Sequence, residues 1–201
     1  FIFFSTSEVY SPLIKKNIAK FPLKEEVDLM INKETQPRDS YYLSKIIGEK
    51  IVQLSGFDHL CLRPHNVYGP RMGYSHVIPE LIRKIKFQKN KKIKIYSPQH
   101  KRAFCYIDDA IDQIIGLSFN LKIKNQIFNI GNSNEEIKIF DLAEIIRKKL
   151  KSKKKLIKHT YTPGSPKRRV PNMSKTNARI RKRSYINLNK GIQHYIDWEK
   201  R

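Results

Sequence analysis

The stretch Tyr41-Tyr42-Leu43-Ser44-Lys45 places a tyrosine and a lysine four residues apart in a pattern that predicts a helix. We expect this helix to run from about Tyr41 to Ser55, with Ser40 as its cap and Gly56 directly after its end. Side chains four residues apart share one helix face, so a phenol lies beside an ammonium group. Because a neighbouring positive charge favours the phenolate form, such a tyrosine can accept a proton near neutral pH.

Segments typical of strands and of helices alternate along the rest of the chain. Short apolar or alternating runs predict strands at Phe1–Ser5, His59–Arg63, Lys92–Tyr96, Ala103–Ile107, Gln126–Ile130 and Leu156–Tyr161. Amphipathic patterns predict helices at Val77–Phe87, Phe140–Leu150 and Leu188–Trp198, and one more that Asp108 or Asp109 caps and that ends near Phe119. Loops are predicted at Ser11–Ser40, Asn66–Tyr74 and Thr162–Pro171. The alternation predicts an α/β fold with a parallel sheet.

The composition is typical of one globular domain. The chain has 201 residues, of which 39% are hydrophobic, and this length is sufficient for a real core. It contains no apolar run long enough to span a membrane and no basic region before Phe1, so we expect a cytoplasmic protein. Cys61 and Cys105 lie in apolar surroundings, which predicts free thiols rather than a disulfide or a metal site.

The chain is strongly basic, with a formal net charge of +23. Between Ile145 and Ile196 there are 17 lysines or arginines and no acidic residue. Such a balance is compatible with a nucleic-acid-binding module. However, the basic residues lack interleaved aromatic side chains and match no known module of that kind. An anionic small-molecule ligand explains part of the charge more economically, and nucleic-acid binding remains the less favoured alternative.

Four further motifs accompany the tyrosine and lysine. Thr6-Ser7-Glu8 follows the first strand, where open α/β sheets bind ligands. The others are Leu62–Pro70, which closes a strand, Arg102–Asp109, and Pro166–Asn172, which contains Arg169. Guanidinium groups bind phosphate oxygens through two parallel hydrogen bonds, so the arginines suit a diphosphate.

Taken together and in this order, the motifs resemble the extended short-chain dehydrogenase/reductase family, in particular its NAD-dependent epimerase/dehydratase group. Members of that group act on nucleotide sugars. The resemblance implies a Rossmann-like doubly wound parallel sheet with a small carboxyl-terminal α/β substrate-binding part. We expect residues 1–70 and 103–131 to form the Rossmann-like core, and residues 71–102 and 132–201 to form the substrate-binding part.

The resemblance also implies a catalytic set, which consists of Thr6, Ser7, Glu8, Tyr41 and Lys45. Thr6 matches the hydroxyl that binds the sugar 4-OH, and Tyr41 matches the base. Lys45 matches the lysine that binds the nicotinamide ribose, so both Tyr41 and Lys45 also belong to the predicted NAD site.

Further residues of the predicted site follow from the same resemblance. Pro64 and His65 fall where the family's chain passes the nicotinamide. Asn66 matches an asparagine near the sugar diphosphate, and Arg102 and Arg169 match arginines that hold it. No metal is expected. Family members usually pair through helices that include the one carrying Tyr41, so a homodimer is expected.

The reaction implied by the resemblance is a transient oxidation at C4 of the sugar, with hydride passing to NAD. Epimerisation, dehydration or decarboxylation can follow. A glutamate beside the substrate can serve as a general acid or base, and Thr6-Ser7-Glu8 looks like the UDP-glucuronate decarboxylases and also like the GDP-mannose dehydratases. We expect the decarboxylase-like branch, and the nucleotide and sugar remain open.

One part of the family pattern is missing. The eight glycines do not form the G-x-x-G-x-x-G loop that cradles the NAD pyrophosphate. We therefore expect an amino-terminally truncated sequence that carries the catalytic and substrate-binding part and binds NAD poorly by itself. The alternative is an inactive relic of the fold with a binding role.

Overall fold

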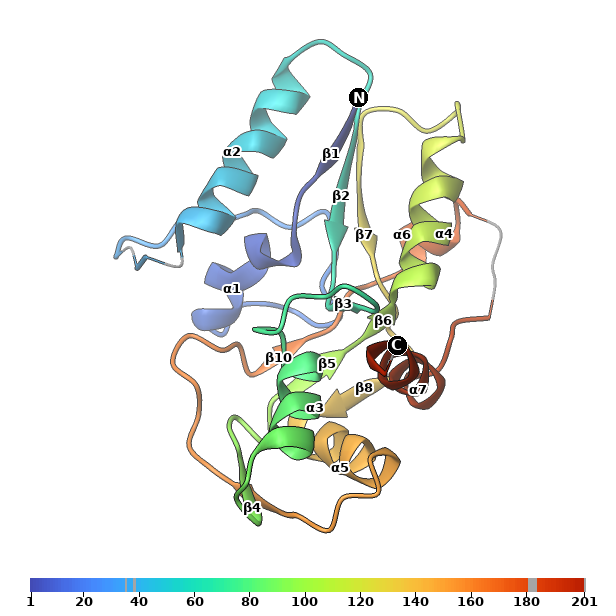
Figure 1. Ribbon diagram of the computed structural model, residues 1–201. Helices are drawn as coiled ribbons and strands as arrows, with labels where there is room; N and C mark the ends of the chain where they lie inside the picture. Colours follow the sequence, from blue (N-terminus) through green and yellow to red (C-terminus); the bar gives the residue numbers. More distant parts are fainter. Residues whose placement is uncertain (35, 38, 181–183, 201) are drawn as a thin grey trace.

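Three parallel strands form the centre of the computed structural model, which describes residues 1–34, 36–37, 39–180 and 184–200 (Figure 1). Their order is β1 (Ile2–Phe4), β2 (Leu60–Pro64) and β7 (Gln126–Ile130). Phe4 pairs with Leu62, which pairs with Phe128, so the three carboxyl ends meet at one edge. The predicted α/β fold with a parallel sheet is confirmed.

Helices pack beside this sheet. The longest, α2 (Asp39–Leu54), contacts β1, and α4 (Ile107–Ser118) contacts β2 and β7 (Figure 1). Beneath α2, the 3₁₀ helix η1 (Ser7–Tyr10) and the short α1 (Ser11–Lys15) bring apolar side chains against its inner face. Burial of these faces holds η1 at the end of β1, so the polar residues that follow β1 have a fixed place.

The other half of the molecule contains shorter strands and its own core. Arg168–Arg169 (β10) and Lys101–Ala103 (β5) pair in parallel, and β5 pairs with Glu136–Lys138 (β8) in antiparallel. Two parallel pairs are β3 (Val67–Tyr68) with β6 (Cys105–Tyr106) and β4 (Lys92–Ile95) with β9 (Lys155–Lys158). The helices are α3 (Val77–Phe87), α5 (Ile139–Lys149), α6 (Ser174–Asn177) and α7 (Leu188–Glu199).

The largest hydrophobic cluster lies among α3, α5, α7, β4 and β9. Two smaller clusters lie against the β1-β2-β7 sheet. This arrangement parallels the expected division into residues 1–70 with 103–131 and residues 71–102 with 132–201, which stays a prediction.

Several local predictions were wrong. Ser40 is not a cap, because α2 already begins at Asp39, whose carboxylate accepts a hydrogen bond from the Gln36 amide. Asp108 and Asp109 do not cap α4 either, since that helix begins at Ile107 and Tyr106 precedes it. The two carboxylates lie in its first turn, where they still favour the helix dipole.

Short elements escaped the sequence patterns. The predicted loop at residues 11–40 begins with α1, the loop at residues 66–74 contains β3, and the loop at residues 162–171 contains β10. The predicted strand at residues 103–107 is divided between β5 and β6, and α4 starts at its last residue. Elements of two to five residues are too short to show a periodicity.

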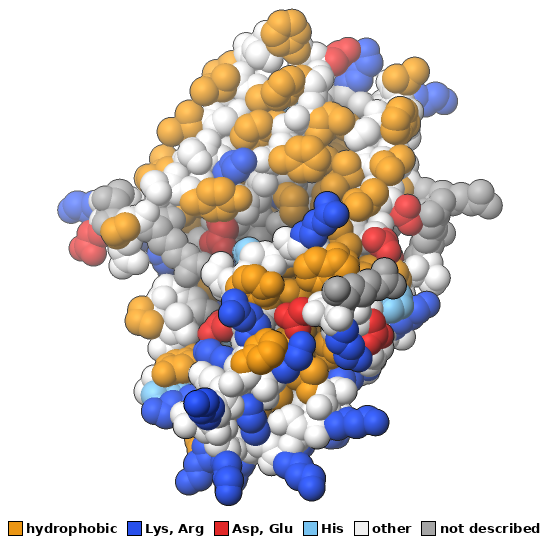
Figure 2. All heavy atoms as spheres, viewed as in Figure 1, with side chains coloured by type: hydrophobic (Ala, Val, Ile, Leu, Met, Phe, Trp, Pro, Cys, Tyr) orange, Lys and Arg blue, Asp and Glu red, His pale blue; other side chains and the backbone are white. Residues whose placement is uncertain are grey.

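The surface is divided by chemistry. Figure 2 shows hydrophobic side chains over α2, β1 and α4. Two large apolar side chains, Ile51 on α2 and Phe119 directly after α4, are 63% and 81% exposed. Lysines and arginines dominate the opposite end. Within the described ranges, no helix is long and apolar enough to cross a membrane, and no three His, Cys, Asp or Glu side chains are placed to hold a metal ion. Cys61 and Cys105 are buried free thiols.

Candidate active site

A cavity of about 510 Å³ lies between the β1-β2-β7 sheet edge and the α3–β4 region. Four predicted site residues line it, namely Glu8, Asn66, Arg102 and Arg169. The remaining polar lining comes from Ser75, His76, Glu80, Lys84, Lys94, Tyr96, Ser97, Thr162 and Ser165. Side chains that are far apart in the sequence thus share one space.

The two arginines are neighbours because β10 and β5 pair in parallel, with Arg169 opposite Arg102. Both guanidinium groups are buried, with the residues 6% and 9% exposed. Arg169 donates to Glu8 Oε1 at 2.7 Å and to Ser11 Oγ at 3.3 Å, and Ser11 Oγ donates to Glu8 Oε2 at 2.9 Å. Glu8 is therefore held by an arginine and a serine at the wall of the cavity.

Arg102 has only neutral hydrogen-bond acceptors in the described part of the chain. It donates to the Lys101 carbonyl at 2.8 Å and to Ser165 Oγ at 3.1 Å, and it forms no ion pair there. Burial and the neighbouring Arg169 lower the pKa of Arg102 to about 9, while Glu8 acts in the opposite direction. Keeping the Arg102 guanidinium charged in this buried position is unfavourable, and a bound anion would stabilise the charged form.

Asn66 occupies the left-handed backbone region, with a φ of 41°, directly after β2. Asparagine tolerates this conformation better than most residues. Its side-chain amide donates to the Ala103 backbone carbonyl at 2.9 Å, and its own backbone carbonyl accepts a hydrogen bond from the Cys105 backbone amide. These bonds tie the end of β2 to β5 and β6 and place Asn66 in the cavity wall.

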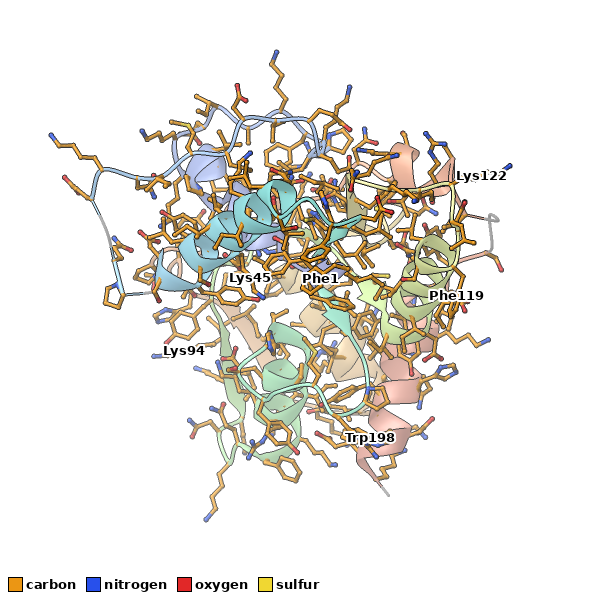
Figure 3. All side chains as sticks on the ribbon, turned by 90° about the horizontal axis from the view of Figure 1, so that it is seen from above. Phe1, Lys45, Lys94, Phe119, Lys122 and Trp198 are labelled. Carbon is orange, nitrogen blue, oxygen red and sulfur yellow. The ribbon has the colours of Figure 1, made fainter. Side chains whose placement is uncertain are left out.

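Tyr41 and Lys45 lie together on α2, as their spacing predicts. The Lys45 ammonium is 5.8 Å from the centroid of the Tyr41 ring and donates to the Phe4 carbonyl at 2.8 Å, at the end of β1. Tyr41 is 51% exposed, so its phenol is accessible. Neither residue lines the 510 Å³ cavity. Figure 3 shows Lys45 on α2, beside the strand that begins at Phe1.

Thr6 and Ser7 are buried where β1 turns into η1. Thr6 Oγ1 accepts a hydrogen bond from the Glu8 amide at 3.2 Å and so caps η1. The hydroxyl of Thr6 keeps its own proton for a further acceptor. This cap fixes the direction in which Glu8 leaves the backbone.

Pro64 ends β2, and His65 turns inward after it. His65 is fully buried, and its Nε2 lies 2.9 Å from Asn129 Oδ1, whose amide nitrogen donates to the Leu23 carbonyl. The amide orientation makes Nε2 the donor. Burial, reinforced by nearby Arg169 and Arg63, lowers the pKa of His65 to about 3. The imidazole is neutral at physiological pH.

The sequence patterns missed a buried ion pair behind the site. Arg63 donates to both carboxylate oxygens of Glu49, at 2.8 and 2.7 Å, and to the Tyr10 hydroxyl at 2.8 Å. Ser5 also donates to Glu49. An arginine inside a predicted buried strand was the available signal, because a buried guanidinium requires a partner. Glu49 follows Lys45 by four residues, so the pair anchors the α2 stripe that carries Lys45 and Tyr41.

The donor set at the end of β1 suits one part of an NAD molecule. An accessible phenol and ammonium at the end of β1 fit the hydroxyls of a ribose. The sequence contains no glycine-rich loop for the pyrophosphate. The residues present therefore fit the nicotinamide end of the cofactor alone.

Comparison with known proteins decides the family. Residues 1–131 match the NAD dependent epimerase/dehydratase family. The chain belongs to this family. Relatives include UDP-D-apiose/UDP-D-xylose synthase 2 of Arabidopsis thaliana, which is 29% identical over 171 residues that cover 72% of this chain and 44% of that protein. GDP-L-fucose synthase of Sinorhizobium fredii is 31% identical over 172 residues, 79% of this chain and 54% of that protein.

Solved structures of the family share the fold. UDP-glucose 4-epimerase of Thermotoga maritima, solved with UDP-glucose, superposes with a TM-score of 0.82 at 20% identity, covering 100% of this chain and 63% of that one. The NDP-hexosamine 5,6-dehydratase TunA gives 0.80 at 20% identity, covering 99% and 62%. The chain spans about half the length of the curated relatives it matches.

Proposed function

We propose that the chain is the catalytic and substrate-binding part of an NAD-dependent enzyme that transforms a nucleotide sugar through transient oxidation at C4. One observation supports this most directly. Two adjacent buried arginines, Arg102 and Arg169, share the cavity with Glu8, which pairs with Arg169, and among the described residues no carboxylate pairs with Arg102. A diphosphate supplies the missing negative charge and suits a guanidinium fork.

In this proposal, the cavity residues bind and orient the ligand. Arg102 binds the diphosphate, and Asn66 lies beside the sugar diphosphate at the cavity wall. Arg169 contacts both the diphosphate region and Glu8, so it couples ligand binding to the position of this carboxylate. The chain at Pro64 and His65 borders the nicotinamide. The His65 side chain itself lies in the core.

The chemistry is assigned to the carboxyl edge of the sheet. The site would hold NAD through Tyr41 and Lys45, and this cofactor would supply the hydride chemistry at C4. Tyr41 takes the proton from the sugar 4-OH, and Thr6 positions that hydroxyl. Lys45 holds the ribose. Ser7 and Glu8 stand beside the sugar, where Glu8 acts as a general acid or base.

Decarboxylation is the outcome we favour. A ketone at C4 of a uronic acid makes the attached carboxylate a leaving group, because the electron pair left at C5 is delocalised into the ketone. In this proposal Glu8, which Arg169 and Ser11 hold, returns a proton to C5 after the loss of CO2. The proposed enzyme is a homodimer in the cytoplasm.

The test is a product analysis with a matched variant. The protein, fused to a glycine-rich NAD-binding segment, is incubated with NAD and one of three substrates: UDP-glucuronate, GDP-mannose or UDP-glucose. The masses of the products are then measured by mass spectrometry. We expect loss of CO2 from UDP-glucuronate. Tyr41→Phe should reduce turnover at least 100-fold, in keeping with the value of a positioned acid or base.

Tyr74→Phe is the control, because Tyr74 is a comparably exposed tyrosine, 53% against 51%, outside the proposed catalytic set. It should retain full turnover. Loss of water from GDP-mannose instead would reassign the outcome to dehydration. Unchanged turnover in Tyr41→Phe would contradict the assigned base.

A further inference from the structure

Lysines lie side by side on the outer face of the β4–β9 pair. Lys92 is in register with Lys155, and Lys94 lies two residues further along the same exposed face of β4. Along β4 the exposed residues Lys92 and Lys94 alternate with isoleucines that are buried in the core. The pairing therefore places lysines from two distant parts of the sequence on one surface.

The loops that lead into these strands add more lysines at the same end. The Lys155 amide donates to the Lys91 carbonyl at 2.8 Å, which holds the two loops together. We call the surface formed by these exposed residues the lysine face; it consists of Lys89, Lys91, Lys92, Lys94, Lys151, Lys153 and Lys155. Figure 2 shows the corresponding gathering of basic side chains at the β4 and α5 end. None of the seven forms an ion pair within the described ranges.

The fold itself does not require this charge. Like charges that face each other across paired strands destabilise a sheet. Any polar side chain would satisfy the outward positions of β4 and β9, because only the alternate residues enter the core. The lysines that lack acidic partners among the described residues therefore favour binding of an anion.

The lysine face leads directly to the cavity. Lys94 belongs to both, and Tyr96, which follows β4, also lines the cavity. Lys84 lies at the same rim but is already bonded to Glu80. Positive charge therefore runs from the outer surface through Lys94 to the buried Arg102.

We propose that the lysine face is an electrostatic capture surface that steers a dianionic ligand, the diphosphate of a nucleotide sugar, into this cavity. The inference rests on the proposed function. A surface of one charge sign beside a cleft raises association rates by about 10- to 1,000-fold. At an ionic strength of about 0.15 M the Debye length is about 8 Å, so the lysines nearest the mouth contribute most.

The test compares two triple variants of equal charge. Lys91→Gln/Lys92→Gln/Lys155→Gln removes three charges from the lysine face. Lys20→Gln/Lys122→Gln/Lys190→Gln removes three exposed charges elsewhere, and Figure 3 shows Lys122 on the opposite side of the molecule from Lys94. Association and dissociation rates of a fluorescent UDP-glucose analogue are measured by stopped flow at several salt concentrations, after circular dichroism has verified the fold.

We expect the first variant to associate about tenfold more slowly at low salt, with the dissociation rate within about twofold. The difference should vanish near 0.5 M salt, where charges are screened within a few ångströms. The second variant should associate like the unsubstituted chain. This pattern separates local steering from the net charge.

Three results would overturn the proposal. Equal association rates in all three proteins would contradict capture while leaving the proposed function intact. Absence of binding to the unsubstituted chain would contradict the proposed function and the capture role together. Salt-sensitive binding of a DNA oligonucleotide that only the first variant loses, with unchanged association of the UDP-glucose analogue, would assign the lysine face to nucleic acid.

Discussion

At the scale of single residues, the candidate site depends on how charges are paired inside the molecule. Arg169 is matched by Glu8, and Arg63 is matched by Glu49, but Arg102 meets only neutral oxygens in the described part of the chain. The motifs identified Arg102 and Arg169 from the sequence. Their adjacency was not predictable, because it depends on the pairing of β10 with β5, and two-residue strands leave no periodic signal.

His65 makes the stability of the protein sensitive to acid. Its pKa is about 3 in the folded chain and about 6.5 when exposed, so the unfolded state binds more protons between these values. Stability should therefore fall as the pH drops below about 6.5, by roughly 2 kcal/mol between pH 7 and pH 5. Urea unfolding at both pH values measures the loss.

The variant His65→Gln tests whether His65 causes this loss of stability in acid. A glutamine cannot gain a proton in this range, so the difference in stability between pH 7 and pH 5 should shrink by most of that amount. His159→Gln is the matched control, since His159 directly follows β9 and makes an exposed hydrogen bond with Thr160. An unchanged pH dependence in His65→Gln would show that other groups cause it.

At the scale of elements, α2 is the piece that positions the catalytic pair. The periodic pattern predicted this helix, α3 and β7 almost to the residue, because each buries a regular apolar face. The interaction that fixes α2 to the sheet was missed. It joins Glu49 to Arg63 and Ser5, and a single sequence does not reveal which buried polar residues meet.

Removal of one partner from this pair should be costly. Glu49→Gln leaves the buried Arg63 without its counter-charge, and we expect the free energy of unfolding to fall by about 3–5 kcal/mol. Glu144→Gln, which breaks the half-exposed pair with Arg147, should cost less than about 1 kcal/mol. Chemical denaturation compares the two. Equal losses would mean that the buried pair does not anchor α2.

At the scale of the whole molecule, charge and apolar surface are separated. The sequence predicted the α/β class and, through five ordered motifs, the family. It could not show that Glu8, Asn66, Arg102 and Arg169 share a cavity apart from Tyr41 and Lys45. That separation arises because the cavity residues come from η1, β5, β10 and the turn after β2, whereas the tyrosine and lysine lie on α2.

The central claim is that this cavity binds the diphosphate of a nucleotide sugar through Arg102. Calorimetric titration of UDP-glucuronate into the unsubstituted chain, Arg102→Ala and the surface control Arg147→Ala tests it most directly. We predict binding by the first and third proteins and at least 10-fold weaker binding by Arg102→Ala, since a charge-assisted hydrogen bond is worth about 1.5–3 kcal/mol. Equal affinity in Arg102→Ala, or no binding by any of the three, would contradict the account.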